Sequence, residues 1–439
     1  MNDLTRRRFD RGAMHQPRAL KLRCITLASL FAAPFAASAG EQSPEVAVGG
    51  CYTMTEVPPL GIPDELGQRL VALDQRGHVL LDALPGRAED GPWSSGETAR
   101  TAFVWTGDEV LPIVIDGFAQ TRAVDFNEQG DVLVFGTLNP GIEPLYSFLE
   151  TWWTEAAIWR DGEVLARMSV ADKAESDFTN GTINERGTAA LSVTDRTAAL
   201  VRQGLGGTYR MRGGEIEDLG KWFLGALNDD DELFGVDPEA HEFVKWGDAR
   251  TVLPTDCPDD PLDHADVQIS RDGTVVATLW CGPATYFGVT WTQGAMQKLP
   301  TLGDPSGRTL TYDLNNRGEI VGSAVSAELG FESVLWRDGE IVALPVPESA
   351  SVNGDEYTDI NEQGLVVGVF NNKDDDNPAS EYHFYVSDGE LMRELPYPSP
   401  GGSDEDAAMF INDRGDIAGW MGDPLGSRHR TMLWRPCAP

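Results

Sequence analysis

Short apolar runs, several of them rich in β-branched residues, recur along most of the chain, each next to a turn signal. Segments such as INERGTAALS and INEQGLVVGV place an aliphatic residue, an Asn, two polar residues and a Gly before a strand-like run. An Asn side chain caps a turn and Gly accepts a positive φ, so each segment predicts a tight turn that leads into a strand. The Gly position of the eight copies falls at 77, 130, 187, 231, 273, 318, 364 and 415, with Asp in the fourth copy.

A second motif alternates with the first. It is a short apolar strand, often ending in Trp, then a Gly-containing turn and another strand, as in SVLWRDGEIVALP and AAIWRDGEVLA. The Asp-Gly pair is typical of a β-hairpin turn. Each unit therefore holds four antiparallel strands, a to d, which is typical of a β-propeller blade. Eight motif pairs predict an all-β, eight-bladed propeller, with seven blades as the alternative.

The two ends of the repeat region complement each other. The eighth unit contains strands a, b and c and then ends, whereas residues 51–57 precede the first unit without a partner of their own. We expect residues 51–57 to complete the last blade, because this pairing removes both open edges of the ring. Residues 40–439 then form a single propeller domain.

The N-terminal residues 1–39 have the pattern of an export signal. Basic residues precede an apolar run at 24–35, and the small residues at 37–39 offer a cleavage site. The pattern is compatible with a start at either Met1 or Met14. We therefore expect a secreted protein, either periplasmic or extracellular, and no membrane insertion, because no other run has the length of a membrane helix.

Four cysteines remain after this segment, an even number that suits an oxidising compartment. Four cysteines allow three connectivities. Closure of the ring by residues 51–57 brings Cys51 near Cys437, which leaves Cys257 and Cys281 as the second pair. We predict these two disulfides.

The chain is strongly acidic, with 34 Lys and Arg against 70 Asp and Glu and a formal net charge of −36. Phosphate binding needs clustered Lys and Arg, so this charge argues against nucleic acid as a partner. It favours a cationic partner or Ca²⁺, and we expect no other cofactor. Asp374, Asp375 and Asp376 are the weak candidates for a metal site, although their spacing does not match a calcium-binding loop.

Catalytic motifs are absent from the sequence: there is no HExxH, no GxSxG and no P-loop. The tryptophans that end strand c recur once per blade, and we interpret them as packing residues. They lie at 105, 159, 246, 291, 336 and 434.

Insertions fall only in the b–c and d–a connections, which share one face of a propeller. Binding loops on a rigid scaffold belong on such a face. The connections 84–100 and 137–154 also carry aromatic residues, which can mark a partner site. These candidate binding residues are Trp93, Tyr146, Phe148, Trp152 and Trp153. Local packing over the ring is the alternative role for them.

A family resemblance adds to this interpretation. The segment KLPTLGDPSGRTLTYDLNNRGEIVGSAVSAELGFESVLWRDGEIVALP, residues 298–345, resembles the HAF-repeat proteins, which are bacterial extracellular repeat proteins. The resemblance covers residues 66–436, although Glu332-Ser333-Val334 stands where the family has His-Ala-Phe. It implies export and a β-repeat fold, and it implies no catalytic residues.

Two functions are compatible with these observations. The first is an exported, non-enzymatic and monomeric scaffold that binds a ligand or a protein through the long-loop face. The second is a propeller enzyme, such as a lyase, hydrolase or quinoprotein, with its site in the central channel. The expected inner strands offer mainly Tyr, Thr and Asp, so we favour binding and leave catalysis open.

Overall fold

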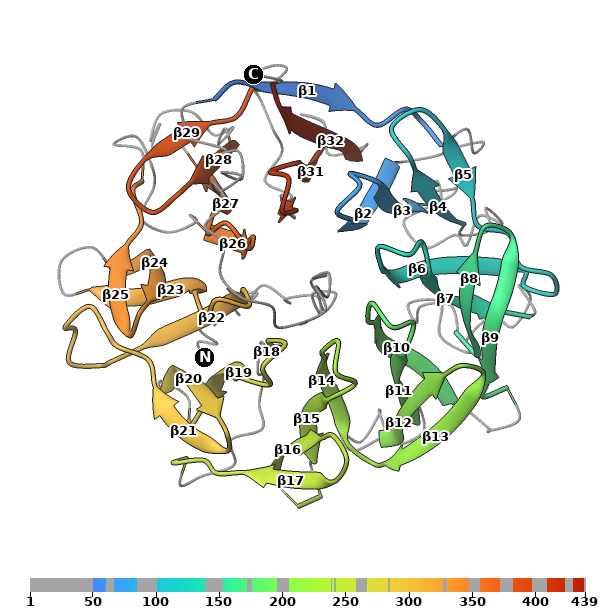
Figure 1. The fold of residues 1–439 in the computed structure, drawn as a ribbon, viewed down its shortest axis with the longest axis horizontal. Coiled ribbons are helices and arrows are strands. Elements are labelled where there is room, and N and C mark those ends of the chain that lie inside the picture. Colours follow the sequence, from blue (N-terminus) through green and yellow to red (C-terminus); the bar gives the residue numbers. More distant parts are fainter. Residues whose placement is uncertain are drawn as a thin grey trace, which may run out of the picture.

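The computed structural model describes the strands and turns of a closed ring (Figure 1). The described residues are 50–60, 67–84, 101–138, 153–171, 176–195, 205–237, 239–240, 242–257, 267–282, 285–326, 330–346, 356–371, 382–396, 409–422 and 429–437. They form β-strands and no helix, and accordingly no helix that could cross a membrane. The expected export signal at 1–39 lies outside them.

Eight blades of four antiparallel strands surround one axis, which confirms the predicted all-β eight-bladed propeller. In the first four blades the strands a to d are β2 Gly67–Leu73, β3 Val79–Leu84, β4 Ala102–Trp105 and β5 Val110–Pro112; β6 Gln120–Phe126, β7 Val132–Thr137, β8 Glu155–Arg160 and β9 Glu163–Ser169; β10 Ser176–Ile183, β11 Ala189–Asp195, β12 Leu205–Arg212 and β13 Glu215–Gly220; β14 Phe223–Leu227, β15 Leu233–Asp237, β16 Glu242–Trp246 and β17 Arg250–Leu253.

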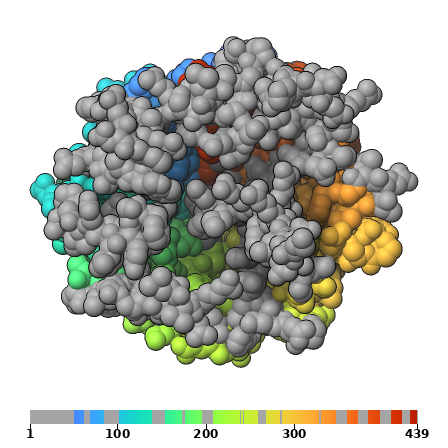
Figure 2. Space-filling model, turned by 180° about the vertical axis from the view of Figure 1, so that it is seen from behind, coloured from blue at the N-terminus to red at the C-terminus, as the bar shows by residue number. Residues whose placement is uncertain are grey.

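The remaining blades continue the ring in chain order, and Figure 2 shows the same colour order from behind. Their strands are β18 Val267–Ile269, β19 Val275–Trp280, β20 Tyr286–Thr292 and β21 Ala295–Lys298; β22 Thr309–Leu314, β23 Ile320–Ser326, β24 Gly330–Arg337 and β25 Glu340–Ala343; β26 Glu356–Ile360, β27 Val366–Asn371, β28 Tyr382–Ser387 and β29 Met392–Glu394; and β30 Met409–Ile411, β31 Ile417–Gly422, β32 His429–Pro436 and β1 Tyr52–Glu56.

The eighth blade takes its outer strand from the other end of the chain, as predicted. Strand β1 pairs antiparallel with β32, from Tyr52 opposite Pro436 onward. The predicted Cys51–Cys437 disulfide continues this pairing, and the N–H of Cys437 donates to the carbonyl of Cys51 at 2.8 Å. The ends of the ring are therefore joined by both backbone hydrogen bonds and a covalent bond.

The second predicted disulfide is also present. Cys257 follows β17 at the end of the fourth blade, and Cys281 follows β19 in the fifth. This bond joins the connection that follows the fourth blade to the b–c connection of the fifth.

The a–b turns have the predicted chemistry. In the seventh blade the side-chain oxygen of Asn361 accepts hydrogen bonds from the N–H groups of Gln363 and Leu365, at 3.0 and 2.9 Å. Gly364 in this turn has a φ of +82°, which only glycine adopts without strain. Asp231 takes that place in the fourth copy at a φ of +62°. The repeated Asn and Gly therefore both suit the shape of the turn, and Asp takes the place of the Gly in one copy and of the Asn in another.

The tryptophans of strand c pack between blades, as predicted. In three of them the indole N–H donates to a proline carbonyl at the end of strand d in the preceding blade, which satisfies the only polar atom of a buried side chain. These bonds run from Trp291 to Pro254 at 2.7 Å, from Trp336 to Pro300 at 2.8 Å and from Trp434 to Pro396 at 2.8 Å.

The apolar core lies mainly between the sheets. Side chains of the second and third blades interdigitate, and the rings of Phe135 and Phe178 stack with centroids 5.3 Å apart. Strand a bends at a bulge next to this core in several blades, for instance between Ala123 and Asp125. A bulge re-aims the neighbouring side chain. Here it precedes the carboxylate that bonds to the next blade.

Candidate functional site at the inner turns

Side chains of the a–b turns connect neighbouring blades around the ring axis. The Asn that caps a turn also donates from its amide nitrogen to the carbonyl of the equivalent residue in the next blade. Around the ring these bonds run from Asn127 to Asn184, Asn184 to Asn228, Asn228 to Ser270, Asn315 to Asn361, Asn361 to Asn412 and Asn412 to Asp74, at 2.9 to 3.1 Å. One residue type therefore shapes each turn and joins it to the next.

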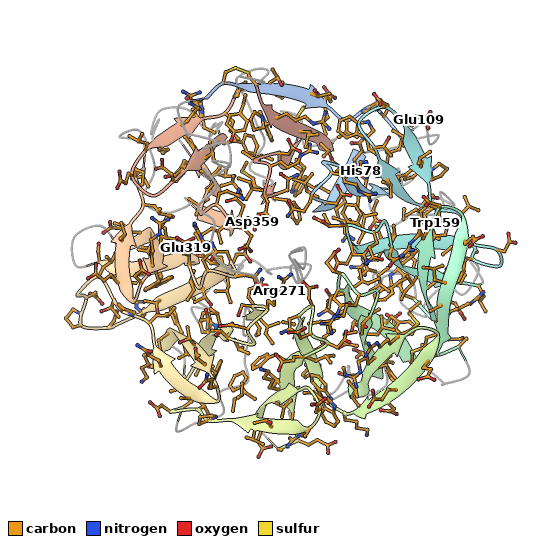
Figure 3. The ribbon with its side chains drawn as sticks, viewed as in Figure 1. His78, Glu109, Trp159, Arg271, Glu319 and Asp359 are labelled. Atoms are coloured by element: carbon orange, nitrogen blue, oxygen red, sulfur yellow. A yellow bond between two sulfur atoms is a disulfide. The ribbon has the colours of Figure 1, made fainter. Side chains whose placement is uncertain are left out.

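The residue after this Asn makes a second set of contacts. Its backbone N–H donates to the side chain of the equivalent residue in the next blade. The bonds run from Glu128 to Glu185, Glu185 to Asp229, Arg271 to Asn316, Asn316 to Glu362, Glu362 to Asp413 and Asp413 to Gln75, at 2.7 to 3.1 Å. Arg271 is the only cation among the eight residues at this position, and it contacts Asp229 at 3.4 Å. Figure 3 shows Arg271 nearer the axis than Glu109 or Trp159.

The crowding of carboxylates changes their acidity. Burial, with repulsion from Glu185, Asp74 and Asp413, raises the pKa of Glu128 to about 7, and Arg76 opposes this rise. Burial also raises the pKa of Asp229, against the hydrogen bonds that it accepts. With a pKa of about 7, Glu128 is partly protonated near neutral pH.

Buried carboxylates also connect neighbouring blades behind the turns. Asp125 accepts hydrogen bonds from the hydroxyl of Thr182 at 2.8 Å and from the N–H of Ile183 at 3.0 Å, both in the next blade. Burial raises the pKa of Asp125 to about 7, because these bonds only partly replace lost hydration. Asp359, labelled in Figure 3, accepts the N–H of Ile411 in the same way, at 2.7 Å.

Trp153 is the one predicted binding residue that the structure describes. It is 1% exposed and belongs to the core cluster between the second and third blades, together with Phe135 and Phe178. Its backbone N–H donates to Asp177 and its carbonyl accepts from the N–H of Phe178. Packing, the alternative role, thus accounts for Trp153. The other four candidates, Trp93, Tyr146, Phe148 and Trp152, lie outside the described residues.

The candidate metal residues Asp374, Asp375 and Asp376 also lie outside the described residues. Within the described part of the chain, no group of three or more His, Cys, Asp or Glu side chains is arranged to hold a metal ion. The carboxylates of the inner turns instead bind arginines: Arg160 lies 2.5 Å from Asp131, and Arg317 and Arg337 both contact Glu319.

Two histidines form carboxylate pairs. Nδ1 of His78 lies 3.2 Å from Oδ2 of Asp74, and Nδ1 of His383 lies 2.5 Å from Oε1 of Glu394. The first pair belongs to the a–b turn of the first blade, whereas the second lies on the outer strands of the seventh. The hydrogen bonds around the first pair run to Arg76 and to the N–H groups of the turn, which is the pattern of a turn cap and not of an activated nucleophile.

The contacts that the turns make between blades were not predicted from the sequence. A signal existed, because the position after the Asn holds Gln, Glu, Glu, Asp, Arg, Asn, Glu and Asp in the eight copies. Side chains of this kind are ordinary in exposed turns, so the pattern alone does not reveal their bonds to the next blade.

Comparison with known proteins finds distantly similar structures and no related sequence. No protein-family model matches the chain, and no curated protein matches it. Solved propeller structures do match. A catalytically inactive virginiamycin B lyase from Staphylococcus aureus is 9% identical over 88% of this chain and 100% of its own, with a TM-score of 0.40. An acylaminoacyl peptidase from Pyrococcus horikoshii is 10% identical over 86% of this chain and 53% of its own, with a TM-score of 0.44.

A prolyl endopeptidase is similar at the same level, with 9% identity over 86% of this chain and 51% of its own and a TM-score of 0.45. This chain spans about half the length of the two peptidases. Likeness at this level carries no activity across, because one fold hosts many unrelated functions.

Proposed function

We propose that this protein is an exported binding scaffold, which holds a ligand or protein partner on the face formed by its b–c and d–a connections. The observation that carries the proposal is the length of these connections. The a–b turns all have the length of 74–78, and the c–d turns are no longer than 106–109. By contrast, 85–101, 138–154 and 395–408 separate strands on the other face.

A rigid ring supports this function. Asn side chains, inner-turn N–H bonds and buried carboxylates connect the blades on the short-turn side, and a disulfide closes the ring. Variable loops on a rigid frame are the usual basis of recognition, because the frame removes part of the ordering cost of binding. The net charge of −36 supports a cationic partner or Ca²⁺.

The test separates recognition from packing among the aromatic residues. A variant that replaces Trp93, Tyr146, Phe148 and Trp152 by Ala keeps the melting temperature of the wild type if these side chains serve recognition. The probes are CaCl₂ in calorimetry and an array of Lys- and Arg-rich peptides, with an acidic peptide array as the control. We expect the variant to lose at least about 30-fold in affinity for the peptides that the wild type binds, as interface aromatics do.

The matched control is Trp153→Ala. This side chain is buried, so its loss should lower the free energy of unfolding by about 3–5 kcal/mol. A similar loss of stability in the fourfold variant would assign those residues to packing, and unchanged peptide affinity would place recognition elsewhere. Either result contradicts the proposed face.

A further inference from the structure

The joints between neighbouring blades are here called seams and numbered by the two blades. They differ in how many of the two inter-blade hydrogen bonds their inner turns make. Seven seams carry at least one of the two inter-blade bonds described above, either from the Asn amide or from the N–H of the next residue. Seam 4–5 keeps only the bond from Asn228, at 3.0 Å, and seam 5–6 only the bond from Arg271 to Asn316, at 2.7 Å. At seam 4–5 Arg271 offers no acceptor for the N–H bond, and the Asn bond remains. At seam 5–6 Ser270 replaces the Asn, and the N–H bond remains.

Seam 1–2 carries neither bond. The first blade has Asp74 in place of Asn, and an ionised carboxylate cannot donate to the carbonyl of Asn127. The N–H of Gln75 makes no hydrogen bond to Glu128, the residue at the matching position of the second blade. One carboxylate oxygen of Glu128, Oε1, is buried without any hydrogen-bond partner. The second blade therefore holds an unused acceptor at the position that accepts the N–H bond in other blades.

Charged groups from three other blades act electrostatically on Glu128. Asp74 and Arg76 belong to the first blade, Asp413 to the eighth and Glu185 to the third. Arg76 is bound to Asp74, with Nε 3.0 Å from Oδ2, and His78 lies against the same carboxylate at 3.2 Å. The charges of Asp74, Asp413 and Glu185 thus disfavour the ionised form of Glu128, and the Arg76 guanidinium that opposes them is also bound to Asp74.

We propose that seam 1–2 is a proton-dependent joint, closed at its inner end when Glu128 is neutral and loosened when Glu128 is ionised. A neutral carboxyl group ends the repulsion from Asp74, Asp413 and Glu185 and supplies an O–H donor at a seam that lacks one. An ionised Glu128 restores the repulsion and leaves a buried charge without a donor, which is costly. The turns 74–78 and 127–131 would then separate while the strands behind them stay paired.

The direction of the pH effect follows from linkage. Glu128 has a pKa of about 7 in the closed seam and its ordinary pKa of 4.5 when the turns part and water reaches it. Opening then releases a proton, so the opening constant rises with pH between 4.5 and 7, by no more than about tenfold per pH unit, and levels off above 7. The seam is tightest in acid and loosest above neutrality.

Hydrogen exchange measured on the full oxidised chain tests the proposal. Amide protection is compared at pH 5, 6, 7 and 8 in peptides that cover 74–79 and 127–132, after division by the intrinsic exchange rate at each pH. We expect protection there to fall between pH 5 and 7 and to stay constant above 7. Peptides over the matching turns 315–319 and 361–365 serve as the internal control and should show no such fall.

Two variants make the result decisive. Glu128→Gln removes the titrating group and keeps its shape, so protection at seam 1–2 should no longer depend on pH. Asp74→Asn supplies the amide donor that six other blades have, and it should raise protection at pH 8 by about fivefold or more, the worth of one hydrogen bond. Glu362→Gln at seam 6–7 is the matched control and should change neither profile.

The proposal fails if the fall in protection persists in Glu128→Gln, or if seams 1–2 and 6–7 show the same pH dependence in the wild type. Should Glu128→Gln fail to fold, Asp74→Asn decides alone. Unchanged amide protection of seam 1–2 at pH 8 in Asp74→Asn would contradict the proposal.

Discussion

The first blade is bound to its two neighbours in different ways. On the side of the eighth blade, Asn412 donates to the carbonyl of Asp74 at 2.9 Å and the N–H of Asp413 donates to Gln75 at 2.7 Å. On the side of the second blade the inner turns make no such bond. Contact there lies further out, where the N–H of Ala123 donates to Asp82 at 2.7 Å within an apolar cluster.

This difference shows what the repeated Asn contributes. Asp74 caps its own turn as well as Asn does, because its carboxylate accepts from the N–H groups of Arg76 and His78 at 2.9 and 2.7 Å. What Asp lacks is the amide donor that reaches the next blade. Shape within the turn and attachment between turns are therefore separate functions of one residue, and only the second is lost at seam 1–2.

The largest effect is expected where the ring is closed covalently. Cys51→Ser removes a disulfide between residues separated by 386 positions, which should lower the free energy of unfolding by about 6 kcal/mol on the chain-entropy account. Denaturant unfolding of the oxidised protein, followed by Trp fluorescence, measures the loss.

Cys257→Ser is the matched control, since that bond spans only 24 positions and should cost about 3 kcal/mol. Equal losses in the two variants would mean that closure of the ring adds nothing beyond an ordinary cross-link. The two seams of the first blade would then differ only in the hydrogen bonds of their inner turns.

Much of this fold could be predicted from the sequence because the repeat is short-range chemistry. Asn and Gly specify each turn locally, and the eight copies fix the number of blades. The buried carboxylates could not be predicted in the same way. Asp125 and Asp359 look like the many acidic residues of a chain with net charge −36, and only the fold reveals that they accept N–H groups from the next blade.

Trp153 illustrates the same limit at the candidate binding site. Its neighbours in sequence place it in an insertion, and an aromatic residue in a loop is a reasonable candidate for recognition. Its burial depends on Phe135 and Phe178, which lie 18 and 25 positions away on two different blades. Contacts at that distance are not encoded in any local pattern, so the sequence left recognition and packing equally open.

A smaller effect is expected from the inner turns themselves. Asn412→Ala removes both the turn cap and the donor to the first blade, and it should cost about 2–3 kcal/mol in denaturant unfolding, because buried backbone groups lose their partners. Asp74→Ala removes only a turn cap and the side-chain pairs with Arg76 and His78.

The loss in Asp74→Ala should therefore be smaller by about 1 kcal/mol, the net worth of one inter-blade hydrogen bond. A loss in Asp74→Ala that matches or exceeds the loss in Asn412→Ala would show that the amide contributes nothing between blades. The different hydrogen bonding at the two seams of the first blade would then make no difference to the free energy of unfolding.

The smallest effect concerns the next seam, where Asp125 joins the second blade to the third. Burial raises the pKa of Asp125 from 3.8 to about 7, so the folded protein holds a proton there that the unfolded chain has already lost. Stability from this group is fully present below pH 3.8 and declines as the pH rises through 7. Between pH 5 and 7 the decline amounts to about 2 kcal/mol.

Asp125→Asn should remove this decline, because the amide cannot ionise while its oxygen still accepts from Thr182 and Ile183. Urea unfolding at pH 5, 6 and 7 gives the pH dependence of the whole ring, and hydrogen exchange at 74–79 and 127–132 gives that of seam 1–2. Asp125→Asn should abolish the pH dependence of unfolding between pH 5 and 7 and leave that of hydrogen exchange at seam 1–2 unchanged. The reason is that Asp125 lies behind the turns and on the other side of the second blade. If one substitution flattened both, a single coupled acidic network would titrate across the two seams, and Glu128 would not act as a separate joint.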